Sequence, residues 1–462
     1  MNRPRDHWSS SFGFVLAATG SAIGLGNLWK FPFITWENEG GAFVLIYLLC
    51  IAAVGLPIMM AEVLVGRKTQ KSAVGALKQA VGKNWGIVGG WGVLGGFTIL
   101  SFYAVVAGWS VSYFIKTLGW SISGFPEGLS VGDSFTGFVS DAPTQLFYAA
   151  LFMGATVFVV LAGITGGIER VSRIFLPILG CILVLMLVSA LSMEGASEAL
   201  SFIFVPDFSQ LTSRSVLEAL GHSFFTLSLG MGAMIVYGSY LSRDQSVVRA
   251  SAIIVVLDTV IALAATVIMF SVIFTVPGMA EEVGKSTAGM LFISLPSLFY
   301  DVVPFGRVLG PLFYLLVALA ALTSTISLLE VVASYFIDEQ RMTRRRAVLT
   351  SGGAIFVFTI LSALSLGAVP ALSNFELFDG KLGFFSTMDH FAANWVLPIG
   401  GFLTTIAVGW FMTKEATSAE LVDEHTPGWF SYEAWRFFIR FVAPVAVGAI
   451  LVAVVFFRAD FS

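Results

Sequence analysis

The chain has 462 residues, of which 57% are hydrophobic and 12% are charged, with a mean hydropathy of +0.88. A soluble domain carries about 25% charged residues, so this composition excludes an ordinary soluble protein and predicts an all-α polytopic membrane protein. The net charge of −4 and the scattered basic residues give no indication of a nucleic-acid partner.

Apolar runs long enough to cross a hydrocarbon core of about 30 Å recur along the chain. They predict eleven spans, at 11–36, 41–65, 86–117, 146–163, 171–192, 215–240, 248–275, 308–337, 347–368, 389–412 and 433–457. An apolar stretch near 290–300, which contains Pro296, is expected to belong to an extracellular loop or a re-entrant helix.

The distribution of lysine and arginine predicts the orientation. With a cytoplasmic N-terminus, 18 of the 25 basic residues fall on the inner side, as the positive-inside rule requires. We therefore expect a cytoplasmic segment at 1–10 and an extracytoplasmic C-terminus. The compactness of the chain and the absence of a predicted loop disulfide indicate a location in a bacterial inner membrane.

Two of the predicted spans carry glycines and polar residues at mid-membrane depth. The first contains TGSAIGLGN at 19–27, and the sixth contains FFTLSLGMGA at 224–233. Backbone that unwinds there needs internal partners, because lipid offers none. Close helix packing through small residues is the alternative interpretation. The five-span offset favours two inverted repeats, at 11–192 and 193–412, with a substrate site between them; residues 413–462 would form a cytoplasmic loop and the last span.

Four motifs carry a resemblance to a known family. GSAIGLGNLWKFPF at 20–33, GGAF at 40–43, FFTLSLGMG at 224–232 and LTSTISLL at 322–329 resemble the neurotransmitter:sodium symporter family, and especially its bacterial LeuT-type amino acid transporters. The resemblance covers nearly the whole chain. It implies a LeuT-type 5+5 inverted-repeat bundle with broken helices 1 and 6, alternating access, and cotransport of sodium with an amino acid or amine.

The resemblance also implies two sodium sites built from oxygen ligands. The first would combine three carbonyls with two hydroxyls, from Gly20, Ile23, Ala320, Thr323 and Ser324. The alternative for the two hydroxyls is a hydrogen bond to carbonyls one turn earlier in their helix. The second site would use Ala22, Asn27, Thr226 and Asp258.

Asp258 departs from the family pattern, which usually has asparagine there. A carboxylate inside an apolar helix is costly unless it is paired. Some family members use chloride to balance sodium, and others hold a glutamate one turn further on, where this chain has Ala262. We therefore expect Asp258 to act both as a sodium ligand and as a fixed anion, so that chloride is not required. A protonated, hydrogen-bonded Asp258 is the alternative.

The family places its substrate between the two breaks. Helix amide ends suit a carboxylate, and carbonyl ends suit an ammonium group. Amine carriers of the family have aspartate at the position of Gly24, so glycine there indicates a substrate with its own carboxylate, which Tyr103 would bind. The expected substrate-binding residues are Ala22, Gly24, Gly26, Ile99, Tyr103, Phe225, Thr226, Ser228, Met231, Ser324 and Leu328. Because Ile99, Met231 and Leu328 are apolar, we expect a neutral apolar or aromatic amino acid.

The resemblance implies a gate on each side of this pocket. Lys30 and Asp389 would form the outer gate, although lysine cannot make the bidentate pair of the arginine that the family usually has. The inner gate would use Arg5, Asp338, Trp8 and Tyr240.

Three further polar residues lie in or near the spans. His222, near the outer gate, is either a titratable group or a hydrogen-bonded vestibule residue. Glu62 matches a family glutamate that supports the backbone of span one. Glu330 has no role in the family pattern and could belong to a proton path or to the inner water pathway.

Other functions fit the sequence less well. A proton-coupled carrier of the same fold, using Asp258, Glu330 or His222, would not need both hydroxyls of the LTST motif. A membrane amino acid sensor would be expected to carry a soluble output domain. An enzyme is disfavoured, since the chain has no HExxH or GxSxG motif in a usable context and its GLGN glycines follow no strand.

Overall fold

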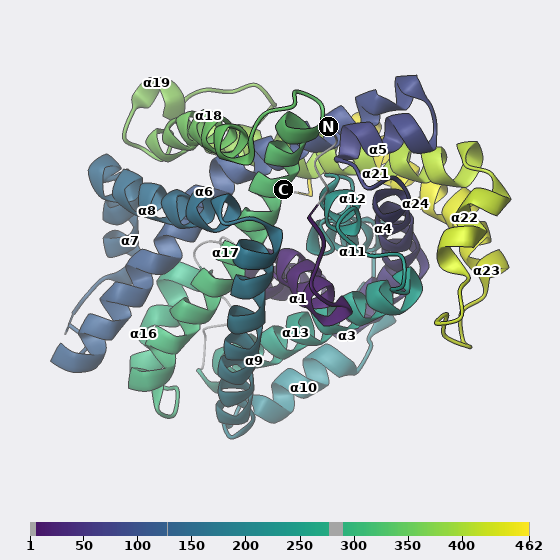
Figure 1. Cartoon of the computed structure of the whole chain (residues 1–462). Helices are drawn as coiled ribbons and strands as arrows, with labels where there is room; N and C mark the ends of the chain where they lie inside the picture. Colours follow the sequence, from purple (N-terminus) through teal and green to yellow (C-terminus); the bar gives the residue numbers. More distant parts are fainter. Residues whose placement is uncertain (1–5, 127, 277–289, 462) are drawn as a thin grey trace.

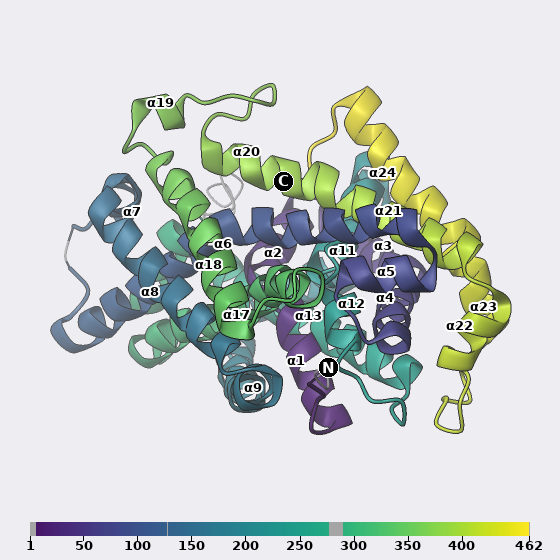
Figure 2. The same ribbon diagram turned by 45° about the horizontal axis from the view of Figure 1, so that its top comes forward.

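The computed structural model describes residues 6–126, 128–276 and 290–461. Regular structure in these ranges is helical, and the only β-type pairing there is an isolated bridge between Glu376 and Leu382. In Figures 1 and 2, α1 (Ser11–Ala22), α12 (Ala233–Gly238) and α17 (Gly306–Asp338) lie near the middle, with α7 (Val131–Ser140) and α23 (Tyr432–Phe437) at opposite edges.

Within the described ranges, nine helical segments are long and apolar enough to cross a membrane. They are Gly41–Thr69 (α3 and α4), Lys83–Ser123 (with α6, Gly86–Ser123), Ala142–Leu161 (α8), Ile164–Leu191 (with α9, Arg170–Leu191), Val247–Thr275 (α13), Gly306–Asp338 (α17), Arg344–Leu364 (α18), Phe384–Phe411 (α20 and α21) and Tyr432–Phe457 (α23 and α24).

Two predicted spans are broken, as the glycine motifs indicate. The first consists of α1 and the segment Gly26–Glu37, which contains α2 (Phe31–Glu37) and is bent by 51° from α1. The sixth consists of α11 (Ser213–Thr226) and α12, of 14 and 6 residues. Each of these is shorter than the roughly 20 residues that a continuous crossing needs, so helix length alone counts nine or ten spans in the described ranges where the sequence predicts eleven.

Small residues allow the central helices to approach closely. A Cβ atom added at Gly20 would lie 2.9 Å from Leu176 of α9 and 3.1 Å from Thr323 of α17. A Cβ atom at Gly66 of α4 (Leu56–Thr69) would lie 2.0 Å from the carbonyl oxygen of Ile235 of α12. These contacts hold both broken spans against continuous helices, in the manner of small-residue packing in membranes.

The described ends of the chain lie at opposite ends of the bundle. The backbone N–H of Trp8 donates to Tyr240 (3.1 Å) next to the start of span one. The carbonyl of Phe461 accepts a hydrogen bond from Lys30, beyond the break in span one. We refer to these two regions as the Trp8 end and the Lys30 end.

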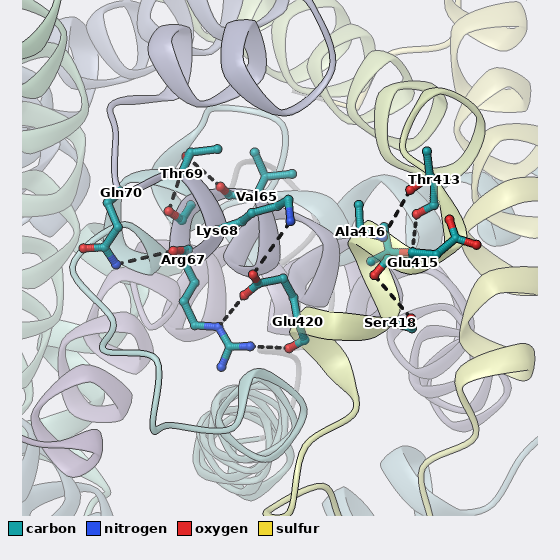
Figure 3. A network of polar contacts seen from close by, with 12 residues as sticks. Val65, Arg67, Lys68, Thr69, Gln70, Thr413, Glu415, Ala416, Ser418 and Glu420 are labelled. Carbon is teal, nitrogen blue, oxygen red and sulfur yellow. Dashed lines mark hydrogen bonds and ion pairs between the residues drawn. The ribbon is translucent and has the colours of Figure 1, made fainter.

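The Trp8 end also holds a contact between α4 and α22 (Lys414–Leu421). Arg67 of α4 pairs with Glu420 of α22 (2.9 Å), and Lys68 lies 4.0 Å from the same carboxylate (Figure 3). The Arg67 guanidinium also donates to the carbonyl of Gln245, in the loop before α13, and Gln70 donates to the carbonyl of Leu241 (2.9 Å). These bonds tie α4 to two connecting segments.

The stretch near 290–300 forms a π-helical turn, Met290–Ser294, followed by α16 (Leu295–Asp301). The apolar helix Leu291–Asp301 is too short to be counted as a span. Its start is fixed by the hydroxyl of Tyr314, which donates to the carbonyl of Leu291 (2.7 Å). The segment therefore forms a short helix packed on α17.

Candidate functional site

The backbone of both breaks leaves the helical conformation where the motifs lie. α1 ends at Ala22, and Ile23 is extended (φ −69°, ψ 105°). After α11, Ser228, Gly230 and Gly232 have φ values of 53°, 79° and 75°. Glycine adopts this left-handed region without steric cost, which explains the Gly-X-Gly of the second break.

Polar side chains satisfy the backbone that the breaks release. The N–H of Leu25 donates to the Tyr103 hydroxyl (3.0 Å), and the Ser228 hydroxyl donates to the carbonyl of Ser21 (3.0 Å). Glu62 accepts from the N–H of Gly230 (2.8 Å). We expected Glu62 to support span one; its hydrogen bond is instead to the break in span six. The two breaks are thus held to each other and to their neighbours.

One small cavity lies between the two breaks. It is lined by all eleven residues predicted to bind substrate: Ala22, Gly24, Gly26, Ile99, Tyr103, Phe225, Thr226, Ser228, Met231, Ser324 and Leu328. Two serines, Ser21 and Ser327, also line it and were not predicted. The Ser21 hydroxyl donates to that of Ser327 (2.7 Å).

Gly24 lines the cavity next to the hydroxyls of Tyr103 and Ser324. A Cβ atom built there would lie 2.8 Å from both the Tyr103 hydroxyl and the Ser324 hydroxyl. Since real Cβ atoms do not approach oxygens this closely, any larger residue would displace one of the two hydroxyls. The absence of a side chain at position 24 therefore keeps these groups facing the cavity.

Asp258 lies at the centre of a buried polar cluster. The Asn27 amide donates to its carboxylate at 2.8 Å, and the Thr226 hydroxyl lies 3.0 and 3.2 Å from its two oxygens. Its side chain is fully buried, and no basic group among the described residues pairs with it. Ala22, the fourth member predicted for this site, is the last residue of α1, so its carbonyl has no partner within the helix.

A second cluster of oxygens lies between α1 and α17. The Ser324 hydroxyl is 3.3 Å from the carbonyls of both Ile23 and Ala320. The Thr323 hydroxyl donates to the carbonyl of Ala320 (2.9 Å), which is the back-bonded alternative named above. Gly20 packs directly against Thr323. All five residues predicted for the first sodium site therefore lie together.

At the Lys30 end, aromatic side chains cover the cavity. The Phe225 ring lies 3.0 Å from the position of a Cβ at Gly26, and the Lys30 amine is 5.1 Å from the centre of that ring. No ion pair between Lys30 and Asp389 occurs, although both residues lie in the described part of the chain. The expected direct pair is therefore absent, and the Lys30 amine donates to the carbonyl of Phe461.

His222 is buried among aromatic rings on the same side. Its ring stacks on Phe31, with centroids 5.4 Å apart, and lies 5.6 Å from the Tyr47 ring. Neither ring nitrogen of His222, nor the Tyr47 hydroxyl, has a hydrogen-bond partner among the described residues. The expectation of a hydrogen-bonded vestibule histidine is therefore not met.

At the Trp8 end, the Trp8 indole packs against the end of α12. The Trp8 Nε1–H donates to the carbonyl of Tyr237 (3.0 Å), and its ring makes edge contacts with Tyr237 and Tyr240. The Tyr240 hydroxyl donates to Glu330 (2.6 Å), which pairs with Arg344. Glu330 is thus part of this buried network.

Asp338 and Arg5 are the two remaining residues predicted at the inner gate. Asp338 accepts the N–H of Ser72 (2.6 Å) at the Trp8 end. Arg5 lies outside the described residues. At this end the Trp8 indole therefore joins the N-terminal segment to α12, Tyr240 joins the end of that span to α17, and Asp338 of α17 binds the residue that precedes α5 (Ala73–Ala80).

A family model described as the Sodium:neurotransmitter symporter family matches residues 5–123 and 140–460. The chain belongs to this family. It is a sodium-dependent transporter and not an enzyme.

Individual members of the symporter family agree with this assignment. An uncharacterised sodium-dependent transporter of Bacillus subtilis, YhdH, is 35% identical over 95% of this chain and 95% of its own length. The sodium-dependent neutral amino acid transporter B(0)AT2 of Pongo abelii is 26% identical, over 65% of this chain and 45% of its own length. The crystal structure of MhsT in complex with L-phenylalanine has 38% identity and a TM-score of 0.87, with 97% of this chain and all of that chain covered. This symporter therefore has the LeuT-type fold.

The sequence analysis did not predict Ser21 and Ser327 in the cavity, or the ion pair of Glu330 with Arg344. Ser327 lies one turn after Ser324 on α17, a spacing that places both on one helix face, so the pattern was available. Ser21 adjoins the predicted Gly20 and Ala22. By contrast, the pairing of Glu330 with Arg344 joins α17 to the next helix, and no local spacing indicates it.

Proposed function

We propose that this protein cotransports sodium with a neutral apolar or aromatic α-amino acid by alternating access, without a requirement for chloride. The observation that carries the proposal is the cavity between the two breaks. It combines freed backbone groups and hydroxyls on one side with apolar side chains on the other. A zwitterion with an apolar side chain is the ligand that matches both sides.

The polar side of the cavity suits the amino acid backbone. The Tyr103 hydroxyl accepts from Leu25 and has its own proton to donate to a substrate carboxylate. The carbonyls at the end of α1 complement an ammonium group. Because Gly24 supplies no carboxylate, the substrate brings its own.

The apolar side of the cavity suits an uncharged side chain. Ile99, Met231 and Leu328 contribute buried apolar surface, and methionine adapts to side chains of different shape. The Ser21 hydroxyl donates to Ser327, whose own hydroxyl donates to the carbonyl of Ser324, so neither proton is directed at a substrate side chain. The L-phenylalanine in the MhsT structure and the name of B(0)AT2 support a neutral substrate.

Two oxygen clusters are the proposed sodium sites. One comprises Gly20, Ile23, Ala320, Thr323 and Ser324, and the other comprises Ala22, Asn27, Thr226 and Asp258. Unwound carbonyls and helix ends coordinate sodium in transporters of this architecture. In each cluster a threonine hydroxyl now donates to an oxygen that a sodium ion would bind, Thr323 to Ala320 and Thr226 to Asp258. A bound ion would replace that hydrogen bond. We therefore propose two ions for each transport cycle.

Independence of chloride follows from the charge of Asp258. A sodium ion beside Asn27 and Thr226 needs a compensating anion, because both residues are buried in the low-dielectric interior. The carboxylate of Asp258 lies within hydrogen-bonding distance of both residues. A mobile anion would add a second negative charge next to it, which the low dielectric constant disfavours.

The gates and the orientation complete the proposal. We assign the Lys30 end to the outside of the bacterial inner membrane and the Trp8 end to the cytoplasm, following the distribution of basic residues. The repeats 11–192 and 193–412 would move around the cavity, while 1–10 carries inner-gate residues and 413–462 forms a loop and the last span.

Binding of radiolabelled amino acids to the purified protein tests the proposal. The panel is leucine, phenylalanine, glycine, lysine and glutamate, each in sodium chloride, sodium gluconate and potassium chloride. We expect leucine or phenylalanine to bind in both sodium salts and not in potassium. Equal binding in potassium would contradict sodium coupling and favour the proton-coupled carrier, and loss in gluconate would contradict the role of Asp258.

A further inference from the structure

The residues that follow α24 (Ala443–Phe457) fold back over the Lys30 end of the bundle. Arg458 adopts a left-handed conformation (φ 50°), and the N–H of Ala459 donates to the carbonyl of Ala453 (3.1 Å). A helix cap of this kind reverses the chain. In Figure 2 the chain leaves the end of α24 and returns toward α20 (Phe384–His390) and the middle of the bundle.

Phe461 occupies a defined seat there. Only 9% of its surface is exposed, and its ring lies 3.6 Å from the position of a Cβ at Gly221 of α11. Its N–H donates to the side-chain oxygen of Asn394 (2.8 Å), and its carbonyl accepts from Lys30. Both backbone groups of Phe461 are therefore bound by side chains, from span one and from span ten.

Asp460 adds polar anchors on the same side. Its carboxylate pairs with Lys381 and accepts from Asn394 (2.9 Å), and it lies 3.2 Å from His390. We call residues 460 and 461 the latch. Four charged or polar side chains from three segments of the chain hold it, which distinguishes it from a chain end that merely covers an apolar surface.

The latch lies next to Phe225, whose ring lines the substrate cavity at the Lys30 end. Lys30, which binds the latch, is also the cation above the Phe225 ring. Phe461, Lys30, Phe225 and His222 line one common hollow at the Lys30 end. Any movement of the outer half of span one away from span ten must break the bonds of Lys30 or Asn394 to Phe461.

On the basis of the function proposed above, we propose that the latch is a third component of the outer gate, which joins span one to span ten in place of a direct Lys30–Asp389 ion pair. When the gate closes, the Phe461 ring packs next to Gly221 and its backbone binds Asn394 and Lys30. Opening it toward the outside requires the latch to leave that seat. Phe461 and Asp460 thus act as positioning residues for Lys30 and do not contact the substrate.

The double variant Asp460→Ala/Phe461→Ala tests this role in the full chain. The readout is the rate at which prebound radiolabelled phenylalanine leaves the protein in sodium after dilution into unlabelled ligand. Because the variant removes a charge-assisted anchor and the buried ring, we expect release to be about tenfold faster. The matched control is Asp379→Asn, whose ion pair with Arg458 is 84% exposed on both sides; its release rate should equal that of the wild type.

A second readout needs no substrate. With Cys50→Ser and Cys181→Ser removing the native thiols, Ala393→Cys places a single thiol in the same hollow as Phe461. A membrane-impermeant maleimide should label it several-fold faster when Asp460 and Phe461 are alanine. Equal labelling rates with and without the latch would overturn the inference. If the wild type binds no amino acid, the proposed function fails, while the labelling rates still decide whether the latch closes this side.

Discussion

Replacing Asp258 by asparagine removes one negative charge and leaves the size of the side chain unchanged. Asn27 and Thr226 contact the carboxylate within 3.2 Å, so an ion bound by these residues would lie beside it. Two opposite unit charges about 4 Å apart attract by about 4 kcal/mol at an effective dielectric constant of about 20. The asparagine also avoids the cost of burying a charge, so the net loss should resemble that of a charged contact, about 1.5–3 kcal/mol.

That loss corresponds to a sodium affinity that is roughly 10- to 150-fold weaker, at 1.4 kcal/mol for each factor of ten. The assay is a sodium titration of phenylalanine binding in gluconate and again in chloride, with the exposed Asp133→Asn as a control. Chloride should recover part of the loss in Asp258→Asn and have no effect on the wild type. A variant whose sodium affinity stays within twofold of the wild type in gluconate would refute the reasoning.

Three further variants probe the rest of the site. Gly24→Ala places a Cβ 2.8 Å from two hydroxyls and should weaken amino acid binding by roughly tenfold or more, whereas Gly90→Ala, with no atom within 4 Å, should bind as the wild type does. Ser324→Ala should weaken sodium activation by about 2- to 10-fold, and Ser334→Ala, a back-bonded serine of the same helix, should leave it unchanged; equal effects would argue against a sodium ligand at 324. Tyr240→Phe loses a 2.6 Å hydrogen bond at the Trp8 end and should speed the release of prebound radiolabelled phenylalanine to that side, measured on inside-out vesicles.

The positions of the two breaks follow from local chemistry, and for that reason the sequence predicts them. Gly230 and Gly232 adopt left-handed conformations that other residues avoid. Gly24 lies against two hydroxyls. Such requirements act over a few residues, so they are visible as motifs, and the family resemblance then places distant members such as Ile99 and Leu328 in the same cavity.

The contacts at the Lys30 end depend on residues far apart in the chain. Lys30 and Phe461 are separated by 431 positions, and nothing in either local sequence indicates that they meet. The family resemblance predicts an ion pair between Lys30 and Asp389. In the structure, Lys30 instead donates a hydrogen bond to the carbonyl of Phe461 in the latch. Glu62 shows the same effect on a smaller scale, since it reaches across to Gly230 and not to the span-one backbone.

Uptake into proteoliposomes tests the central claim most directly. Radiolabelled phenylalanine or leucine is presented to vesicles with an inward sodium gradient, in chloride or in gluconate, and to matched vesicles with potassium on both sides. The account predicts accumulation above the external concentration in both sodium salts and none in potassium. Accumulation that needs a proton gradient, or that stops when chloride is replaced by gluconate, would contradict it.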